Sequence, residues 1–225
     1  MTRSSAETRS EMGHGVFQGM AKKKTKDRKQ DKQSPVQVGE HHRYQIKSGN
    51  LAGTFVARAF PKPPTQARGL IAEASGATEE AAIIALHEVL DSREQRRAED
   101  RRTDEHTGAS VPSVEEYVEA IGHVALTRPQ RAMLLALALS GATGLTETQM
   151  ASAAGYKSQA SGARSFTSAG LLIAEYLSSE AGSTDPSGDP DARSIMGFRA
   201  EPEGAGDPDL WIAHPELREA IQAVL

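Results

Sequence analysis

The sequence contains no cysteine, which excludes disulfide bonds, thiolate metal sites and cysteine nucleophiles. Aromatic residues make up only 4% and hydrophobic residues 38% of the 225 residues, so we do not expect one core that spans the whole chain. No apolar run approaches the roughly 18 residues that span a bilayer, and the N-terminus lacks the apolar segment of a secretory signal. We therefore expect a cytoplasmic protein with no membrane partner.

The motifs of common catalytic and metal sites are also missing. None of the seven histidines stands at HxH or HExxH spacing. No Gly-x-Ser-x-Gly segment and no P-loop occurs. His41 and His42 follow Glu40 at the entry to an expected strand, and we interpret them as surface residues rather than metal ligands. The sequence therefore predicts no enzyme, no cofactor and no metal site.

The net charge of −4 is unevenly distributed along the chain. Residues 1–33 hold 9 Lys/Arg and 4 Asp/Glu, whereas residues 110–225 hold 7 Lys/Arg and 15 Asp/Glu. Affinity for nucleic acid begins with neutralisation of phosphates by cations, so the basic N-terminal segment favours such a partner. The side chains expected to contact phosphates there are Lys22, Lys23, Lys24, Lys26, Arg28 and Lys29.

Residues 1–39 are polar, with only scattered apolar positions. Such a segment buries too little apolar surface to offset the entropy that ordering would cost, so we expect a disordered basic tail. Met20, which precedes Ala21 and three lysines, is an alternative translation start to Met1.

Residues 40–102 predict a small β-β-β-α domain. Turn chemistry at Gly49-Asn50 separates the first two strands, and Pro61 stops the second strand. The strands are expected over residues 42–47, 53–60 and 68–74.

The helix of this domain is expected to begin after Thr78. The Thr78 hydroxyl can accept a hydrogen bond from the first turn, and Glu79 and Glu80 are favourable near a helix N-terminus. An apolar stripe at helical spacing can cover one face of the sheet. Residues 93–102 are expected to form a charged, solvated extension of the helix.

The β-β-β-α order and the helix start Thr78-Glu79-Glu80-Ala81 resemble the N-terminal domains of HicB-like antitoxins. The same order resembles AP2-type and integrase-arm DNA-binding domains, which implies a sheet face that reads the major groove. A solvated sheet face explains the same outward residues equally well. These residues are Arg43, Gln45, Lys47, Thr54 and Arg58.

Residues 103–112 are expected to form a linker to a C-terminal domain over residues 113–225. Three Ser/Thr-x-x-Glu/Gln capping boxes follow the linker, each able to satisfy orphan amides at a helix start. They lie at Ser113 to Glu116, Thr127 to Gln130 and Thr146 to Gln149. They predict helices over residues 113–126, 128–140 and 147–154.

The third of these helices and the next one predict a helix-turn-helix. Gly155 can adopt the positive φ that ends the first helix, and Ser158 caps the second helix, expected over residues 159–178. Two helices joined by a tight turn, the second with a polar leading end, are typical of the unit that places a recognition helix in the major groove. Tyr156 is expected to fill the space beneath the turn.

The C-terminal part completes the predicted domain. Residues 194–199 and 210–213 predict a β-hairpin around the acidic loop 201–209, and a last helix follows Pro215. The segment 145–158 resembles the helix-turn-helix of bacterial winged-helix regulators. This resemblance implies an α+β chain with a winged-helix-like domain that regulates transcription by binding DNA, as a homodimer where two half-sites are read.

Eight residues are the predicted DNA contacts of this domain. Gln can pair with adenine and Arg with guanine at the start of a recognition helix. Ordinary solvent exposure also explains these residues, and the acidic loop would repel phosphates. A protein-interaction module with a protein partner, or RNA binding through the tail, therefore stays open. The residues are Lys157, Ser158, Gln159, Ser161, Arg164, Ser165, Arg128 and Arg131.

Overall fold

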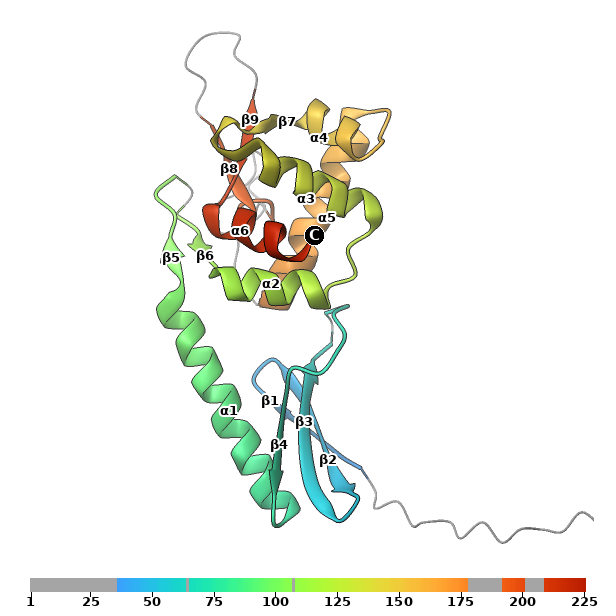
Figure 1. Cartoon of the computed structure of the whole chain (residues 1–225), viewed down its shortest axis with the longest axis vertical. Helices are drawn as coiled ribbons and strands as arrows, with labels where there is room; N and C mark the ends of the chain where they lie inside the picture. Colours follow the sequence, from blue (N-terminus) through green and yellow to red (C-terminus); the bar gives the residue numbers. More distant parts are fainter. Residues whose placement is uncertain (1–35, 64, 107, 178–191, 201–208) are drawn as a thin grey trace, which may run out of the picture. The chain divides into compact units, whose positions relative to one another are not determined.

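The computed structural model describes residues 36–225 except residues 64, 107, 178–191 and 201–208 (Figure 1). The described residues lie in one compact unit that begins at Ser34. They form a four-stranded antiparallel sheet, two smaller sheets and six α-helices, which is the α+β class predicted. Among these helices, none has the length and apolar character that crossing a membrane requires.

The N-terminal sheet contains four strands, where the sequence predicts three. Neighbouring strands pair antiparallel in the order of the chain. The strands are β1 (Gln37–His41), β2 (Tyr44–Leu51), β3 (Thr54–Pro61) and β4 (Ala72–Gly76).

Strand β1 is the one that the sequence prediction missed. Its first four side chains, from Gln37 to Glu40, are all exposed. An edge strand with no buried face carries no alternation of apolar and polar residues, which is the signal that predicts a strand. The predicted third strand was also placed too early, because the chain joins the sheet as β4 only at Ala72.

The turn between β2 and β3 lies later than predicted. Gly49 and Asn50 belong to β2, where they pair with Val56 and Phe55 of β3. The turn is made by Ala52 and Gly53, whose φ angles are 53° and 91°. The Asn50 side chain accepts a hydrogen bond from the Gly53 amide at 2.9 Å, so it stabilises the turn from within the strand.

Helix α1 (Glu79–Asp100) packs along one face of this sheet (Figure 1). The predicted cap is confirmed, because the Thr78 hydroxyl accepts a hydrogen bond from the Ala81 amide at 3.1 Å. Alternate residues of β2 and β3 face the helix and exclude water from a small core. This core contains Tyr44, Ile46, Ala57, Ala59, Ala82, Leu86 and Leu90.

Helix α1 continues to Asp100 as predicted, and residues 95, 96 and 98–100 are exposed, but the other side of this extension is not solvated. Arg97 is 7% exposed, and its Nη2 lies 2.9 Å from Oε2 of Glu119 on α2 (Val114–His123). Arg101 forms a two-pronged hydrogen bond with Glu116, at 2.6 and 2.9 Å. Arg97 and the C-cap residue Arg101 therefore pack against carboxylates of α2, which a charge pattern in one segment cannot reveal.

The predicted linker also contains paired strands. Strand β5 (Arg102–Thr103) pairs antiparallel with β6 (Ser110–Val111) at the two ends of this segment.

The remaining helices pack around a second core. All three predicted capping boxes are confirmed, with both reciprocal hydrogen bonds present in each. The helices are α2, α3 (Arg128–Ser140), α4 (Glu147–Ala153), α5 (Gln159–Leu177) and α6 (Pro215–Val224). A three-stranded sheet lies beside them, in the order β7 (Leu145–Thr146), β9 (Leu210–Ala213) and β8 (Gly197–Arg199).

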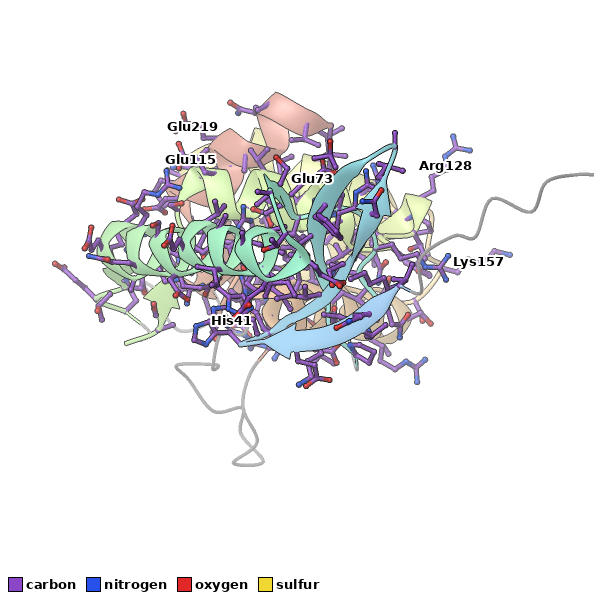
Figure 2. The ribbon with its side chains drawn as sticks, turned by 90° about the horizontal axis from the view of Figure 1, so that it is seen from below. His41, Glu73, Glu115, Arg128, Lys157 and Glu219 are labelled. Atoms are coloured by element: carbon purple, nitrogen blue, oxygen red, sulfur yellow. The ribbon has the colours of Figure 1, made fainter. Side chains whose placement is uncertain are left out.

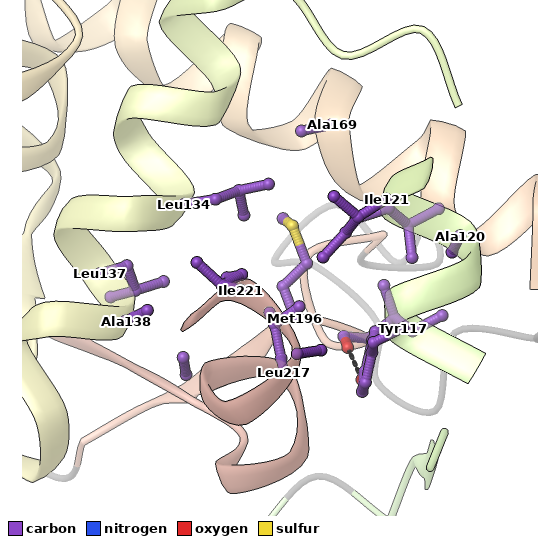
Figure 3. Packing of buried hydrophobic residues seen from close by; sticks show 14 of the residues in the cluster. Tyr117, Ala120, Ile121, Leu134, Leu137, Ala138, Ala169, Met196, Leu217 and Ile221 are labelled. Atoms are coloured by element: carbon purple, nitrogen blue, oxygen red, sulfur yellow. Dashed lines mark hydrogen bonds between the residues drawn. The ribbon is translucent and has the colours of Figure 1, made fainter. Parts of the chain in front are cut away.

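Met196 occupies the middle of this second core. Its side chain lies among Leu134 of α3, Ile121 of α2 and the α6 residues Leu217 and Ile221 (Figure 3). All five residues are buried to 3% exposure or less. The segment before β8 therefore anchors the small sheet to three helices at once. Trp211 of β9 is also buried.

His214, between β9 and α6, is fully buried. Its Nε2 donates to the Ser194 carbonyl at 2.8 Å, and its Nδ1 lies 3.7 Å from the Asp104 carboxylate. Burial lowers the pKa of His214 below its ordinary value because the cation would lose its hydration.

We expect His214 to make folding sensitive to mild acid. The unfolded chain takes up a proton near pH 6.5 and the folded chain does not, so the free energy of unfolding falls as the pH drops below about 6.5. Urea unfolding followed by Trp211 fluorescence between pH 7.5 and 5.5 measures this slope. His214→Gln should flatten it, whereas His106→Gln, at an exposed histidine, should not. Equal slopes for wild type and His214→Gln would refute the assignment.

Candidate functional site: the helix-turn-helix of α4 and α5

The chain between α4 and α5 forms the tight turn that the sequence predicts. Gly155 adopts a φ of 78°, and the Tyr156 amide returns to the Ala151 carbonyl at 2.9 Å. The Ser158 hydroxyl accepts a hydrogen bond from the Ser161 amide at 3.2 Å, so it caps α5. Helix termination, turn and helix start are thus all fixed within five residues.

The two helices are in close contact just beyond the turn. A β-carbon added at Gly162 of α5 would lie 2.4 Å from the β-carbon of Ala151 on α4. Real carbon atoms do not approach so closely, so glycine is required at this crossing. The pair of Ala151 and Gly162 sets the distance between α4 and α5.

Helix α3 and the turn hold α5 from its inner side. The Ser165 hydroxyl bonds to the Tyr156 hydroxyl at 3.0 Å, and the Gln130 side chain donates to the Ser165 carbonyl at 3.3 Å. The hydroxyl oxygens of Ser158 and Ser161 are hydrogen-bonded at 2.9 Å. Ser161 and Ser165, both predicted DNA contacts, are therefore half-buried and positioned to support the turn and α5.

One face of α5 is open to solvent along the whole helix. Arg164 lies near its middle, and no hydrogen bond or ion pair to another described residue engages its guanidinium. The residues of this face recur at intervals of three or four, the spacing of one helix surface. They are Ala160, Arg164, Ser168, Leu171 and Glu175.

Gln159 opens α5 but is bound to α4. Its Nε2 donates to the Glu147 carboxylate at 3.0 Å, and its Oε1 accepts from the Thr148 hydroxyl at 3.4 Å. Both polar atoms of the amide are therefore engaged within the protein. Gln159 is exposed, as its predicted role requires, but its contacts fix the start of α5 against α4.

Two arginines lie beside the carboxylate of Glu147, Arg199 at the end of β8 and Arg193 in the segment before it. Nη1 of Arg193 and Nη2 of Arg199 each lie 3.3 Å from its Oε1. Arg199 also pairs with Asp209 at 3.0 Å, across the β8–β9 hairpin. The sequence prediction missed Arg199 as a site residue, because only its strand pairing places it beside the N-terminus of α4.

The exposed cations Arg128, Arg131 and Lys157 accompany Arg164 in this region. Figure 2 shows Arg128 and Lys157 projecting outward on one side of the view, with Glu115 and Glu219 on the opposite side. Residues 127–177 contain four Lys/Arg and two Asp/Glu, so they are locally basic within an acidic domain. One of these two carboxylates, that of Glu147, already faces two arginines.

Several predicted features lie outside the described residues. They include the acidic loop from residue 201 to residue 208 and the basic tail with Lys22, Lys23, Lys24, Lys26, Arg28 and Lys29. Asp209, at the end of the loop, is described and forms the ion pair with Arg199.

The outward sheet residues predicted in the N-terminal domain have different surroundings. Arg58 pairs with Glu73 at 2.5 Å, and the Lys47 ammonium lies 5.1 Å from the centre of the Phe60 ring. The sequence predicts that Arg43 faces solvent, and this prediction is wrong. Its Nη1 donates to the carbonyl of Tyr176 at the end of α5, at 2.5 Å, which removes it from the sheet surface.

A cluster of histidines lies on the other side of this sheet, between its edge and α1. Nε2 of His41 is 2.7 Å and Nε2 of His42 is 3.0 Å from the same Asp91 oxygen. The ring of His87 stacks on that of His41, with ring centres 3.9 Å apart. About 50 residues separate the two segments, so no motif at local spacing could have indicated the cluster.

Comparison with models of protein families, with curated proteins and with solved structures finds no match to this chain.

Proposed function

We propose that the C-terminal part of the chain is a winged helix-turn-helix that binds duplex DNA through α5. The order α3, β7, α4, α5, β8, β9 and the sheet order β7-β9-β8 support this proposal. The β8–β9 hairpin follows the two helices, as the resemblance to winged-helix regulators predicts, and β7 pairs with its second strand. The tight α4–α5 turn is the unit that presents a recognition helix to the major groove.

The main support for the proposal is that the first half of α5 and the turn before it expose basic side chains to solvent. Lys157 and Arg164 are exposed and form no ion pair with another described residue, while two arginines balance the charge of the nearby Glu147. Unpaired cations gain most from contact with phosphates, because they release counterions without first losing a protein partner. The domain's excess of acidic residues lies outside residues 127–177.

The predicted contacts divide into three roles. Lys157, Arg128 and Arg131 contact phosphates and set the position of the domain on the duplex. Arg164, on the open face of α5, reaches base edges, with guanine as the preferred partner. Gln159 and the serines 158, 161 and 165 act inside the protein and hold the helix in place.

A titration of labelled duplex DNA at several salt concentrations tests this proposal. Lys157→Ala should weaken binding and reduce the slope of log K against log salt by about one, the effect of losing one phosphate contact. Arg164→Ala should also weaken binding, by about 1–3 kcal/mol on sequences that contain its base. Arg96→Ala, at an exposed arginine of α1, is the matched control and should leave both quantities unchanged.

An interaction with a protein partner is the second candidate function. It is favoured by acidic side chains that lie opposite Arg128 and Lys157 in Figure 2. Glu115 of α2 and Glu219 of α6 are exposed there. Unchanged DNA binding in both α5 variants, or no binding by the wild type, would contradict the first proposal. Loss of a co-purifying partner on Glu115→Lys and Glu219→Lys would then support the second one.

A further inference from the structure

We infer that His41, His42 and Asp91 form a binding site for a divalent transition-metal ion of the Zn²⁺ type. One ligand atom from each residue lies within 4.8 Å of the other two. Imidazole nitrogen and carboxylate oxygen are common protein ligands of zinc, and three protein ligands with an open position occur in many zinc sites. This site is separate from the helix-turn-helix and independent of DNA binding.

The geometry needs only a small adjustment to receive an ion. Zinc holds nitrogen and oxygen at about 2.0–2.2 Å, so tetrahedral ligand atoms are about 3.4 Å apart. The two Nε2 atoms lie 2.7 and 3.0 Å from Asp91 Oδ1. Each nitrogen therefore has to move away from this oxygen by about 0.4–0.7 Å for an ion to be coordinated. The side chains of His42 and Asp91 are 57% and 55% exposed, so the ion can enter from solvent and keep water in the open position.

The backbone brings the two histidines together. Side chains of successive residues in a strand point to opposite faces. His42 lies just after β1 and adopts a φ of 49°, in the left-handed region that side chains other than glycine seldom occupy. This conformation breaks the alternation and lets both rings reach the same carboxylate.

His87 positions one of the ligands. It lies four residues before Asp91 on α1 and stacks on His41 with the ring planes 9° apart. The stacked ring holds the His41 imidazole in place beside Asp91. Protons compete with a metal ion for imidazole and carboxylate ligands, so we expect the affinity for zinc to fall at acidic pH.

Calorimetric titration of the full chain with ZnCl₂ at pH 7.5 tests the site. We expect one saturable ion per chain and a higher Tm with zinc, because the ion binds only the folded site tightly. His42→Gln and Asp91→Asn should each weaken binding by at least about tenfold, the lower end of the effect of disturbing a metal site. His106→Gln and Glu88→Gln are the controls, because each changes an exposed histidine or carboxylate outside the cluster. Both should bind zinc as the wild type does.

Circular dichroism confirms that the variants are folded before the affinities are compared. A Co²⁺ spectrum of the wild type should show coordination that is lost in Asp91→Asn. No saturable zinc binding by the wild type, or equal binding by His42→Gln and Asp91→Asn, would overturn the inference.

Discussion

Replacement of Glu116 by alanine is expected to lower the free energy of unfolding by about 3 kcal/mol, because it leaves the half-buried Arg101 without its counter-charge and removes one of the carboxylates beside the buried Arg97. Glu116 is 2% exposed, and both of its oxygens accept hydrogen bonds from Arg101. Its Oε1 also lies 3.7 Å from Arg97, itself 7% exposed. The same carboxylate accepts from the Ser113 amide at 3.2 Å, so its loss also removes one half of a capping box.

Chemical unfolding of Glu116→Ala and of a matched control measures this effect. Glu115→Ala changes the neighbouring residue on the same helix, where the side chain is exposed, and should change stability by no more than about 0.5 kcal/mol. A loss below 1 kcal/mol for Glu116→Ala would mean that water compensates Arg97 and Arg101. The contact of α1 with α2 and with the last carbonyl of α5 would then be weak.

Gly162→Ala is the second change with a large expected effect. Alanine normally stabilises a helix interior relative to glycine by about 0.5–1 kcal/mol. At position 162, however, the new methyl group would lie 2.4 Å from the Ala151 methyl group and 2.9 Å from its α-carbon. Overpacking of this kind costs about 1–3 kcal/mol, which exceeds the gain in helix propensity.

Gly122→Ala is the control for Gly162→Ala, because a β-carbon at Gly122 of α2 meets no other atom within 4 Å. We expect the Tm to rise for Gly122→Ala and to fall for Gly162→Ala. Equal shifts of the same sign would show that α4 and α5 are not in close contact. Since this contact sets the distance between α4 and α5, Gly162→Ala should also weaken DNA binding.

The sequence predicts elements best where a local signal specifies them. The capping boxes of Ser113, Thr127 and Thr146 are satisfied by residues three positions away, and all three are confirmed. Gly155 at the turn is similar, because a positive φ favours glycine at this one position. The helices of the C-terminal part therefore follow from short-range chemistry.

Features that depend on distant partners were missed. The carboxylates that bury Arg97 and Arg101 come from another helix, so the charged segment alone suggests a solvated surface. Strand β1 has no buried face, and pairing with β2 is what orders it. Arg199 reaches Glu147 only through the β7-β9-β8 sheet, and the histidine cluster joins segments on a strand edge and a helix. Local patterns cannot encode these contacts.

Binding of labelled duplex DNA by the intact chain and by a chain that starts at Ser34 tests the role of α5 most directly. The shorter chain removes the basic tail and keeps β1, which begins at Gln37. We expect it to retain DNA binding, with a smaller salt dependence because the tail phosphate contacts are gone. Arg164→Ala in the shorter chain should then weaken the remaining binding. Loss of all binding on removal of the tail, in a chain with an unchanged Tm, would contradict DNA recognition by α5.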